Sequence, residues 1–265
     1  MGLVTLLTDF GTADYYVAAV RGTLLRLAPG ARLVDLSHEL PPGDVEGAAG
    51  LLAAAAPTFP RGTVHLAVVD PGVGGERRIL VVEGGGHRFV APDNGLLTHF
   101  LAPADDPPLV VSVKRHELFL PSPGATFHGR DRFAPVAAAL LRGEEARGLG
   151  PPIGDPVRLP VEPPRREILD GGGTVLRGRV TRVDRFGNLV TDLPADWIPA
   201  GVRPIVEVAQ HSARRWVTHY AELAPGEPGA LVGSLGTVEL SLREESLAAR
   251  WAVDRGAAVR ILLPD

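Results

Sequence analysis

The chain lacks cysteine altogether and contains a single lysine, Lys114, and a single methionine among its 265 residues. Without a thiol it can form no disulfide, thiolate zinc site, iron–sulfur cluster or cysteine nucleophile. With Lys114 as the one amine side chain, Schiff-base chemistry is confined to that position. The other basic residues are arginines that form no cluster, and the formal net charge is −4. We therefore expect no nucleic-acid partner.

Long hydrophobic runs are also missing. The longest apolar stretch, residues 48–56, is well short of the roughly 18 residues that a membrane span needs. The opening MGLVTLLTDF has no basic segment and reaches Asp9 early, which does not match a secretory signal. These features predict a soluble, cytoplasmic protein without a membrane partner. The hydrophobic fraction of 45% and charged fraction of 22% are ordinary for a globular chain.

From residue 1 to about 150, short apolar runs alternate with helical patterns. We expect strands at 3–7, 33–36, 64–69, 79–82, 88–91 and 109–113, and helices at 14–27, 44–56, 94–101 and 132–141. Asp44 and Asp131 are suited to cap the second and fourth of these helices, and Tyr16 falls on the apolar face of the first. The alternation predicts an α/β N-terminal domain, residues 1–150, with a mostly parallel sheet.

The pattern changes after a proline-rich stretch. Six prolines lie between residues 151 and 164, which predicts a stiff, extended linker over 151–166. Beyond it, short β-branched runs fall at 175–183, 189–191, 205–208, 216–219, 230–232, 237–242 and 258–262, with one helix near 244–250. Residues 167–265 are therefore expected to form a smaller all-β C-terminal domain, an antiparallel barrel or sandwich.

Carboxylates follow two of the expected strands, where ligands gather in open α/β sheets. Asp9 and Asp14 flank a glycine turn after the first strand and could hold the two hydroxyls of a ribose. They could equally be structural, with Asp14 capping the next helix and Asp9 holding the turn. After the third strand, Asp70 is followed by Arg77 and Arg78. This pattern fits an oriented catalytic carboxylate or a structural ion pair in a glycine turn.

A histidine, His128, precedes the last helix of the first half, in TFHGRDRF. No second histidine stands at metal-ligand spacing, and HExxH, GxSxG and the phosphate-binding Gly-Lys-Ser/Thr pattern are missing. We therefore predict no metal site, no serine hydrolase and no P-loop. A metal-dependent phosphohydrolase built on Asp9, Asp14 and Asp70 is an alternative that sensitivity to a chelator would reveal.

Two loops of the second half carry polar residues. Asp184, Phe186 and Asn188 lie between two expected strands, either as a hairpin turn or as a group that stacks on and hydrogen-bonds a purine. Ser234 lies in the short Gly233–Gly236 segment, which on its own is typical of a turn.

Five segments stand out in order along the chain: TDFGTADYYVAAVRG, VVDPGVGGERR, APDNGLL, TFHGRDRFAP and VDRFGNLVTD. Together they resemble the S-adenosylmethionine (SAM) hydroxide adenosyltransferase family, the SAM hydrolases related to fluorinase and chlorinase. The resemblance covers nearly the whole chain, including the change from an α/β to a β-rich half. It implies a metal-independent enzyme that splits SAM into adenosine and L-methionine by displacement at the ribose C5′. SAM is then the substrate, and no cofactor is expected.

The resemblance also implies roles for the residues of the first half. Asp70, Arg77 and His128 resemble the family residues that activate water. Asp9 resembles the carboxylate that holds the ribose hydroxyls, and Asp14 lies nearby in the same segment.

For the second half, the resemblance implies contacts with the rest of the substrate. Asp184, Phe186 and Asn188 resemble residues that meet the methionine amine and the adenine from a neighbouring subunit. Ser234 lies where the family holds the methionine carboxylate, although Leu235 stands where relatives often have a polar residue. The family implies a homotrimer, with each site between the α/β domain of one subunit and the β domain of the next.

Two other functions are compatible with these motifs, a chlorinase-like halogenase and a non-catalytic adenosine- or SAM-binding module. The fluorinase has a tyrosine at the position of Asp70 and Tyr-Ser at the positions of His128 and Gly129. A carboxylate facing the reacting carbon repels a halide but can orient water. Only residues 84–86 stand where the halogenases carry a long insertion. These differences favour hydroxide as the nucleophile.

Overall fold

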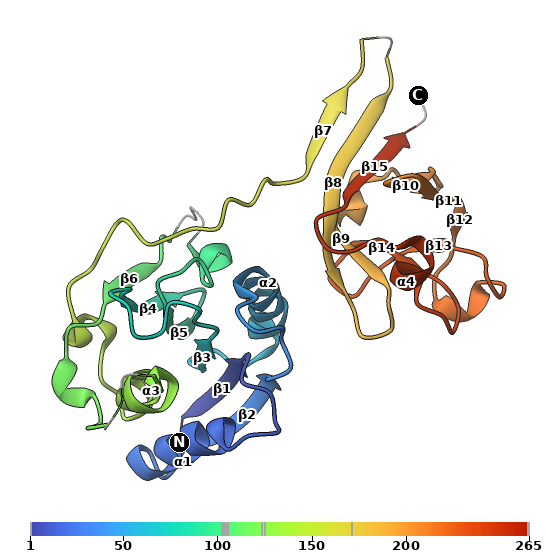
Figure 1. The fold of residues 1–265 in the computed structure, drawn as a ribbon. Helices are drawn as coiled ribbons and strands as arrows, with labels where there is room; N and C mark the ends of the chain where they lie inside the picture. Colours follow the sequence, from blue (N-terminus) through green and yellow to red (C-terminus); the bar gives the residue numbers. More distant parts are fainter. Residues whose placement is uncertain (1, 102–105, 123, 125, 171, 264–265) are drawn as a thin grey trace. The chain divides into compact units, whose positions relative to one another are not determined.

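The computed structural model describes residues 2–101, 106–122, 124, 126–170 and 172–263. Contacts between Cα atoms divide the chain into two compact units, residues 1–160 and 161–265 (Figure 1). The first unit combines helices with a mixed sheet, and the second is built mainly from strands. Each unit has a hydrophobic core of its own.

The sheet of the first unit has six strands in the order β2-β1-β3-β5-β4-β6. Their bounds are Leu3–Thr8 (β1), Arg32–Ser37 (β2), Val64–Val68 (β3), Ile79–Gly84 (β4), His87–Pro92 (β5) and Leu109–Ser112 (β6). The strands β2, β1, β3 and β5 are parallel neighbours, whereas β4 runs antiparallel to β5 and to β6. The sheet is therefore mixed, and the strands expected at 79–82 and 88–91 pair with each other as a hairpin.

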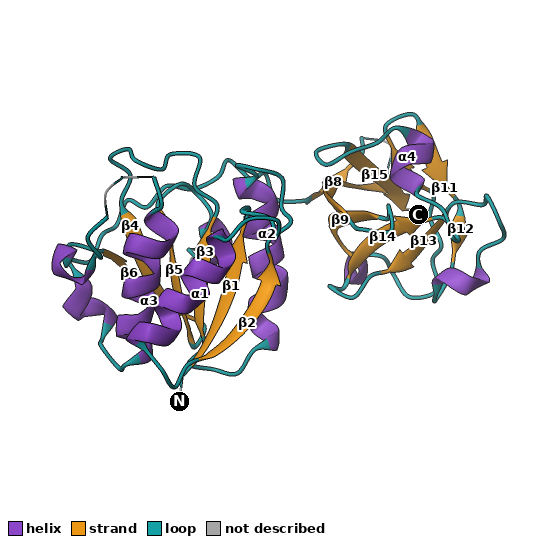
Figure 2. Ribbon diagram, turned by 60° about the horizontal axis from the view of Figure 1, so that its bottom comes forward, coloured by secondary structure: helices purple, strands orange, loops and turns teal. Residues whose placement is uncertain are grey.

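Helices lie on both faces of this sheet (Figure 2). They are α1 (Tyr16–Leu27), α2 (Val45–Ala55) and α3 (Ala134–Leu141). Val64, Leu66 and Val68 of β3 share a core with α1 and α3, while Ala67 and the following Val69 share one with α2. A central strand covered on both faces has to be apolar throughout, as VHLAVV nearly is. None of the helices in the described ranges has the length and apolar character that a membrane crossing requires.

The predicted helix at 94–101 is wrong for most of its length, because only Thr98–Phe100 form a short 3₁₀ turn. Gly95 adopts a left-handed backbone with φ +97°, which interrupts a helix. The Asn94 side chain accepts from Leu96 N and donates to the Val69 carbonyl, so it competes with helical hydrogen bonds.

Asp131 does not cap the last helix of the first unit, contrary to the prediction. The chain enters α3 through a wider, π-type turn at Gly129–Phe133 that already contains Asp131. Pro135 has no N–H to give the Asp131 carbonyl, which instead accepts from Leu120 N at 2.9 Å. Tyr16, expected on the buried face of α1, is 39% exposed because it opens the helix.

The second unit contains nine strands in one sheet. They are β7 (Arg165–Ile168), β8 (Thr174–Val183), β9 (Leu189–Pro194), β10 (Val206–Val208), β11 (His211–Ala213), β12 (Arg215–Trp216), β13 (Gly229–Val232), β14 (Thr237–Ser241) and β15 (Ala258–Leu263), with one helix, α4 (Leu247–Trp251). The order is β11-β10-β15-β8-β9-β14-β13-β12, and β7 pairs with β8. Every pairing is antiparallel except that of β12 with β13.

This sheet is nearly closed, because only Arg214 separates β11 and β12, the two strands at its ends. The predicted antiparallel character is confirmed. The strand expected at 216–219 is shorter than predicted, and β7 and β11 were not anticipated. Both are short and alternate poorly, so periodicity alone gives little signal for them.

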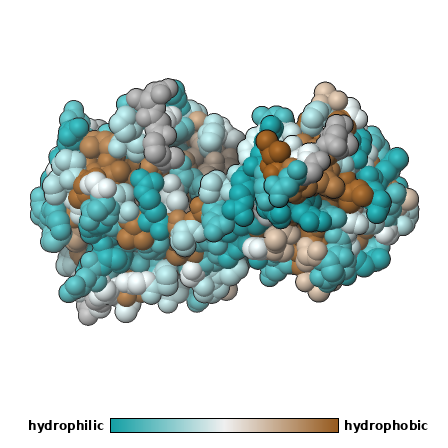
Figure 3. Space-filling view, turned by 90° about the horizontal axis from the view of Figure 1, so that it is seen from above, coloured by the Kyte–Doolittle hydropathy of each residue, from teal (hydrophilic) through white to brown (hydrophobic). Residues whose placement is uncertain are grey.

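The proline-rich segment is extended, and its first ten residues are held by the first unit. Ile153 N donates to the Val110 carbonyl, and Val157 N donates to the Asp93 carboxylate at 2.8 Å. Leu159 N also donates to Thr98 Oγ1 at 2.8 Å, and because prolines leave few N–H groups in this segment, these bonds fix its path. On the face of the molecule shown in Figure 3, exposed apolar side chains form small patches among hydrophilic residues.

His65 is a fully buried polar group in the middle of β3. Its Nδ1 lies 2.7 Å from Thr5 Oγ1, its Nε2 lies 3.2 Å from His87 Nδ1, and its ring stacks on Phe89. Burial, and secondly the charge of His87, lowers the pKa of His65 to about 4. The folded chain therefore keeps this imidazole neutral.

We predict that this histidine makes folding stability depend on pH. The unfolded chain takes up a proton on His65 below about pH 6.5, and the folded chain does so only near pH 4, so stability falls as pH drops through this window. The difference corresponds to about 3 kcal/mol. In His65→Gln, the loss of unfolding free energy between pH 7 and pH 4 should be smaller by this amount in denaturant titrations. His219→Gln, at an exposed histidine, is the control; equal losses in both variants would contradict the prediction.

Candidate functional site

The loop that follows β3 folds back on itself between residues 70 and 78. Val73 N donates to the Asp70 carbonyl at 3.1 Å, and Gly75 N donates to the Gly72 carbonyl at 3.0 Å. Gly74 has φ +86°, a conformation that favours glycine. These tight turns return the chain towards the end of β3 and bring Arg77 against Asp70.

Asp70 and Arg77 form a buried, charge-assisted pair, with side chains that are 5% and 11% exposed. Arg77 Nε lies 2.9 Å from Oδ1 and 3.0 Å from Oδ2, and Nη2 also bonds Oδ2. The guanidinium stacks over the Phe133 ring at 5.1 Å. A planar donor fork of this kind fixes both the position and the orientation of the carboxylate.

Arg77 also reaches His128, which is buried at the entry to α3. Arg77 Nη2 lies 2.7 Å from His128 Nδ1. A guanidinium can only donate, so Nδ1 accepts and the proton of the neutral ring sits on Nε2. Within the described residues, this Nε2 is buried and has no hydrogen-bond partner. The pKa of His128 is lowered by burial and then by the charges of Arg132 and Arg77, which favours the neutral ring.

Arg78 has a different role from its neighbour. Its guanidinium donates to Asp93 at 2.6 Å and to Asp155 at 2.8 Å. Asn94, next in sequence to Asp93, donates to the carbonyl of Val69 at 2.8 Å. The motif APDNGLL thus ties the loop and the end of β3 in place, and it contributes no side chain to the cavity described next. Spacing alone did not separate the two arginines.

A cavity of about 460 Å³ opens beside this trio. Asp9, Asp70 and His128 line it. Asp9 follows β1, and its carboxylate accepts from Gly43 N at 2.8 Å. Asp14, from the same segment, is exposed and is not among the residues that line this cavity. It does not cap α1 either, since the capping position is occupied by Tyr15 without a side-chain hydrogen bond.

Aromatic side chains form one wall of the cavity, and sequence analysis did not assign them a role. Phe10, Tyr15, Tyr16 and Phe127 line it and contact one another edge to face or tilted, with ring centroids 4.8–6.2 Å apart. Gly129 lies against this wall, because a Cβ there would stand 3.1 Å from the Phe10 ring. The sequence could have indicated this wall, because aromatic residues make up only 5% of the chain and four of them lie close to the predicted site residues Asp9 and His128.

In the second unit, Asp184, Phe186 and Asn188 form a tight turn after β8. Asp184 Oδ1 accepts from the backbone N of Phe186 and of Asn188, each at 2.9 Å, and Oδ2 accepts from Asn188 Nδ2 at 2.9 Å. Gly187 has φ +85°, and a Cβ there would collide with Ser246. The carboxylate therefore organises the turn and leaves the Phe186 ring 77% exposed.

The turn borders a second cavity, of about 420 Å³. Phe186, Asn188 and Tyr220 line it, together with residues at 241–246. Ser234 lies exposed on the Gly233–Gly236 turn and is not among its lining residues. The structure thus brings Asp184, Phe186 and Asn188 together and leaves Ser234 apart from them within this unit.

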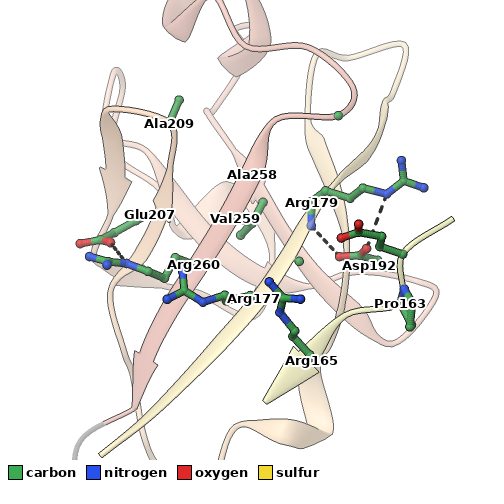
Figure 4. A pocket seen from close by; sticks show the side chains of 13 residues that line it. Pro163, Arg165, Arg177, Arg179, Asp192, Glu207, Ala209, Ala258, Val259 and Arg260 are labelled. Atoms are coloured by element: carbon green, nitrogen blue, oxygen red, sulfur yellow. Dashed lines mark hydrogen bonds and ion pairs between the residues drawn. The ribbon is translucent and has the colours of Figure 1, made fainter. Parts of the chain in front are cut away.

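A third cavity, of about 570 Å³, lies over β8, β10 and β15 and is lined by four arginines (Figure 4). Arg260 pairs with Glu207 at 2.7 Å, Arg177 pairs with Glu167, and Arg179 Nε lies 3.9 Å from Asp192 Oδ2. Much of the positive charge is therefore balanced within the unit, and no residue predicted from sequence lies here. In the described ranges, no group of three or more acidic or histidine side chains is arranged to hold a metal ion.

Comparison with known proteins gives matches along most of the chain. Residues 4–150 match the model of the SAM hydroxide adenosyltransferase N-terminal domain, and residues 178–260 match that of the C-terminal domain. A protein of Thermus thermophilus named (R)-S-adenosyl-L-methionine hydrolase is 42% identical, with 98% of this chain and 99% of the relative covered. A Salinispora tropica protein of the same name is 38% identical, with 97% of both covered. A crystal structure of an uncharacterized conserved protein from Thermotoga maritima aligns with a TM-score of 0.87 and 30% identity, over 97% of this chain and 99% of that one.

We predict that His128 titrates below the usual histidine range and carries its neutral-form proton on Nε2. Arg77→Met removes a positive charge and the donor to Nδ1, so the pKa of His128 should rise. Imidazole nitrogen and carbon chemical shifts in NMR titrations report both properties. Arg78→Met is the matched control, since that guanidinium faces Asp93 and Asp155 instead. A neutral His128 protonated on Nδ1, or an equal rise in both variants, would contradict the assignment.

Proposed function

The chain belongs to the SAM hydroxide adenosyltransferase family, and on that premise we propose that it hydrolyses SAM to adenosine and L-methionine, with water held by Asp70, Arg77 and His128 as the nucleophile. The observation that carries the proposal is the continuous chain of hydrogen bonds from Asp70 through Arg77 to His128. Asp70 and His128 line one cavity with Asp9 and the aromatic wall. This arrangement supports a nucleophile site, a ribose site and an apolar surface side by side.

The reaction makes a specific demand on such a site. The sulfur of SAM is a sulfonium, so methionine leaves readily with the C–S bond electrons and needs no proton from the enzyme. The new bond joins the water oxygen to C5′, and one proton is released overall. What the protein has to supply is a water aligned behind C5′ and shielded from bulk solvent. Such positioning can contribute up to roughly 7–11 kcal/mol.

The hydrogen bonds of the trio suggest how each group acts. His128 has its Nδ1 occupied by Arg77, so its Nε2–H is suited to donate to the water oxygen and hold it in place. Asp70 is the group with lone pairs to receive the proton that water loses. The neutral His128 ring has Nδ1 occupied by Arg77 and its proton on Nε2, so the tautomer favours Asp70 over His128 as the proton acceptor. Because hydroxide character develops as the sulfonium is neutralised, a low-dielectric cavity stabilises the transition state.

Asp9 is proposed to hold the ribose. One of its oxygens accepts from Gly43 N, and the carboxylate lines the cavity with the trio. Two hydroxyls on neighbouring ribose carbons are matched by the two oxygens of one carboxylate. Asp14 lies outside the cavity lining in this unit, so its ribose role rests on the family resemblance alone.

The residues of the second unit are proposed to complete the site. Asp184, Phe186 and Asn188 would meet the methionine amine and the adenine, and Ser234 would meet the methionine carboxylate. In the proposed homotrimer, these residues come from the neighbouring copy of the chain. The exposed Phe186 ring supports this role, because an aromatic surface left open to solvent is suited to stack on a base.

We predict that SAM incubated with the protein in ¹⁸O-labelled water gives adenosine labelled at the 5′-hydroxyl, together with unlabelled methionine. Label at that oxygen follows only from attack of solvent on C5′ with cleavage of the C5′–S bond. Mass spectrometry of both products measures it. The same incubation with excess chloride serves as the control for halogenase chemistry, where 5′-chloro-5′-deoxyadenosine as the main product would overturn the proposal. Retention of SAM without multiple turnover would instead favour a binding module.

We further predict that Asp70→Ala and His128→Ala each lower kcat by about 10²–10⁴-fold, the usual scale for losing a positioned acid–base group. Asp9→Ala should mainly raise KM for SAM, because it removes a contact made before the reaction as well as during it. Steady-state kinetics separate the two effects.

Asp254→Ala, at an exposed aspartate of the second unit, is the control for loss of a carboxylate. Near-normal kcat in either Asp70→Ala or His128→Ala would remove that residue from the mechanism, and an unchanged KM in Asp9→Ala would count against the ribose role.

A further inference from the structure

The cavity of the second unit is lined by two aromatic rings and by several polar side chains. The exposed ring of Phe186 and the partly exposed ring of Tyr220 line it with Asn188. The question that decides what it can bind is which of these polar groups still have a hydrogen to donate, and which have only a lone pair to offer.

The hydroxyl proton of Tyr220 is used in a hydrogen bond within the protein. Its hydroxyl donates to Glu239 Oε1 at 2.6 Å. Glu239 is only 6% exposed, and its Oε2 lies under the Gly233–Gly236 turn, where a Cβ on Gly233 would stand 2.7 Å away. The hydrogen bond to Glu239, then burial, then the charges of Glu239 and Asp184 raise the pKa of Tyr220 to about 12. The phenol therefore stays protonated, and its oxygen can only accept from a ligand.

Asn188 uses one of its two amide hydrogens in the same way. Its Nδ2 donates to Asp184 Oδ2 at 2.9 Å, which fixes the side-chain amide and leaves its second hydrogen and the amide oxygen. The hydroxyl of Ser241, also in the lining, donates to the Leu242 carbonyl at 3.1 Å. Tyr220, Asn188 and Ser241 thus each use a donor hydrogen in a bond within the protein.

Ser246 keeps a donor, as Asn188 does with its second amide hydrogen. Ser246 Oγ accepts from Ala249 N at 3.1 Å, so the Ser246 hydroxyl proton can point into the cavity. Glu244 and Glu245 add carboxylate acceptors at the rim. The lining therefore offers acceptors in excess, and a ligand group that fits must bring N–H donors.

We propose that Tyr220 and Glu239 are specificity-determining residues, which make this cavity select the part of the substrate that presents N–H donors. This rests on the proposed function and goes beyond it, since it names which groups are recognised and how. Two groups of SAM have this chemistry, the exocyclic amine of adenine and the α-ammonium of methionine. A 6-oxo base or a deaminated methionine presents an acceptor where the lining already has one. An unmatched polar group of this kind costs on the order of 10- to 100-fold in affinity.

The test is equilibrium binding of the two products and their mismatched partners to the full chain, by calorimetry. Adenosine is compared with inosine, and L-methionine with its 2-oxo analogue, whose keto oxygen can only accept. The unmodified chain should prefer the amine-bearing member of at least one pair by about tenfold or more, and the pair that is discriminated identifies the group. In Tyr220→Phe the preference should fall to within about threefold, because the accepting oxygen is gone.

Glu239→Gln provides a second variant that does not depend on the first. The glutamine amide can donate to the Tyr220 oxygen, which frees the hydroxyl proton to face the ligand and should also reduce the preference. Glu222→Gln, which bonds Thr218 on the surface of the same unit, should leave the preference unchanged. A purely structural role for Glu239 would weaken both members of a pair equally, so the ratio is the deciding readout.

The inference is overturned if the unmodified chain discriminates neither pair, or if the preference survives in every variant that folds. These measurements need no turnover and are therefore separate from the labelling experiment. A chain that releases labelled adenosine but shows no preference overturns this inference alone, while a chain that releases none overturns the proposed function.

Discussion

The site depends on one side chain, Arg77, which donates to Asp70 and to His128 at the same time. Each contact limits what its partner can do. The carboxylate is held in one orientation, and the imidazole is restricted to the tautomer with its proton on Nε2. A lysine could not replace this arrangement, because a single ammonium lacks the planar fork that spans two acceptors. The proposed roles of His128 as a donor to the water and of Asp70 as the proton acceptor rest on this geometry.

The fold brings the three residues together from distant parts of the chain. Asp70 extends from a strand that is buried on both faces, and the glycine turns after it return Arg77 to that strand end. His128 lies at the entry to α3, where Pro135 cannot donate to the Asp131 carbonyl and the chain takes a wider turn. In the second unit, Asp184 and Glu239 likewise fix the hydrogen-bond direction of Asn188 and Tyr220. In both units, a hydrogen bond inside the protein determines what a neighbouring side chain can offer a ligand.

The sequence was informative where the determinants are local. Apolar strands, glycine turns and the capping Asp44 are patterns of a few residues, and the corresponding elements are present. It was uninformative where a contact joins distant residues. The bridge from Arg77 to His128 spans 51 positions, and the bond from Tyr220 to Glu239 joins a loop to β14. The helix predicted at 94–101 is absent for most of its length because Gly95 and Asn94 favour a turn. Asp131 does not cap α3, contrary to the prediction, because Pro135 changes the entry to that helix. The roles assigned to the site residues, Asp14 and Ser234 among them, remain predictions.

The anchoring of the extended segment has a practical consequence for fragment design. Arg78 bonds Asp155, and Asp93 bonds both Arg78 and the backbone of Val157, so the loop that carries Arg77 is braced by residues beyond 150. An excised first unit should therefore terminate after residue 160. A boundary at residue 150 would keep Asp70, Arg77 and His128. It would remove Asp155 and Val157, which hold Arg78 and Asp93, so the loop that carries Arg77 would lose part of its support.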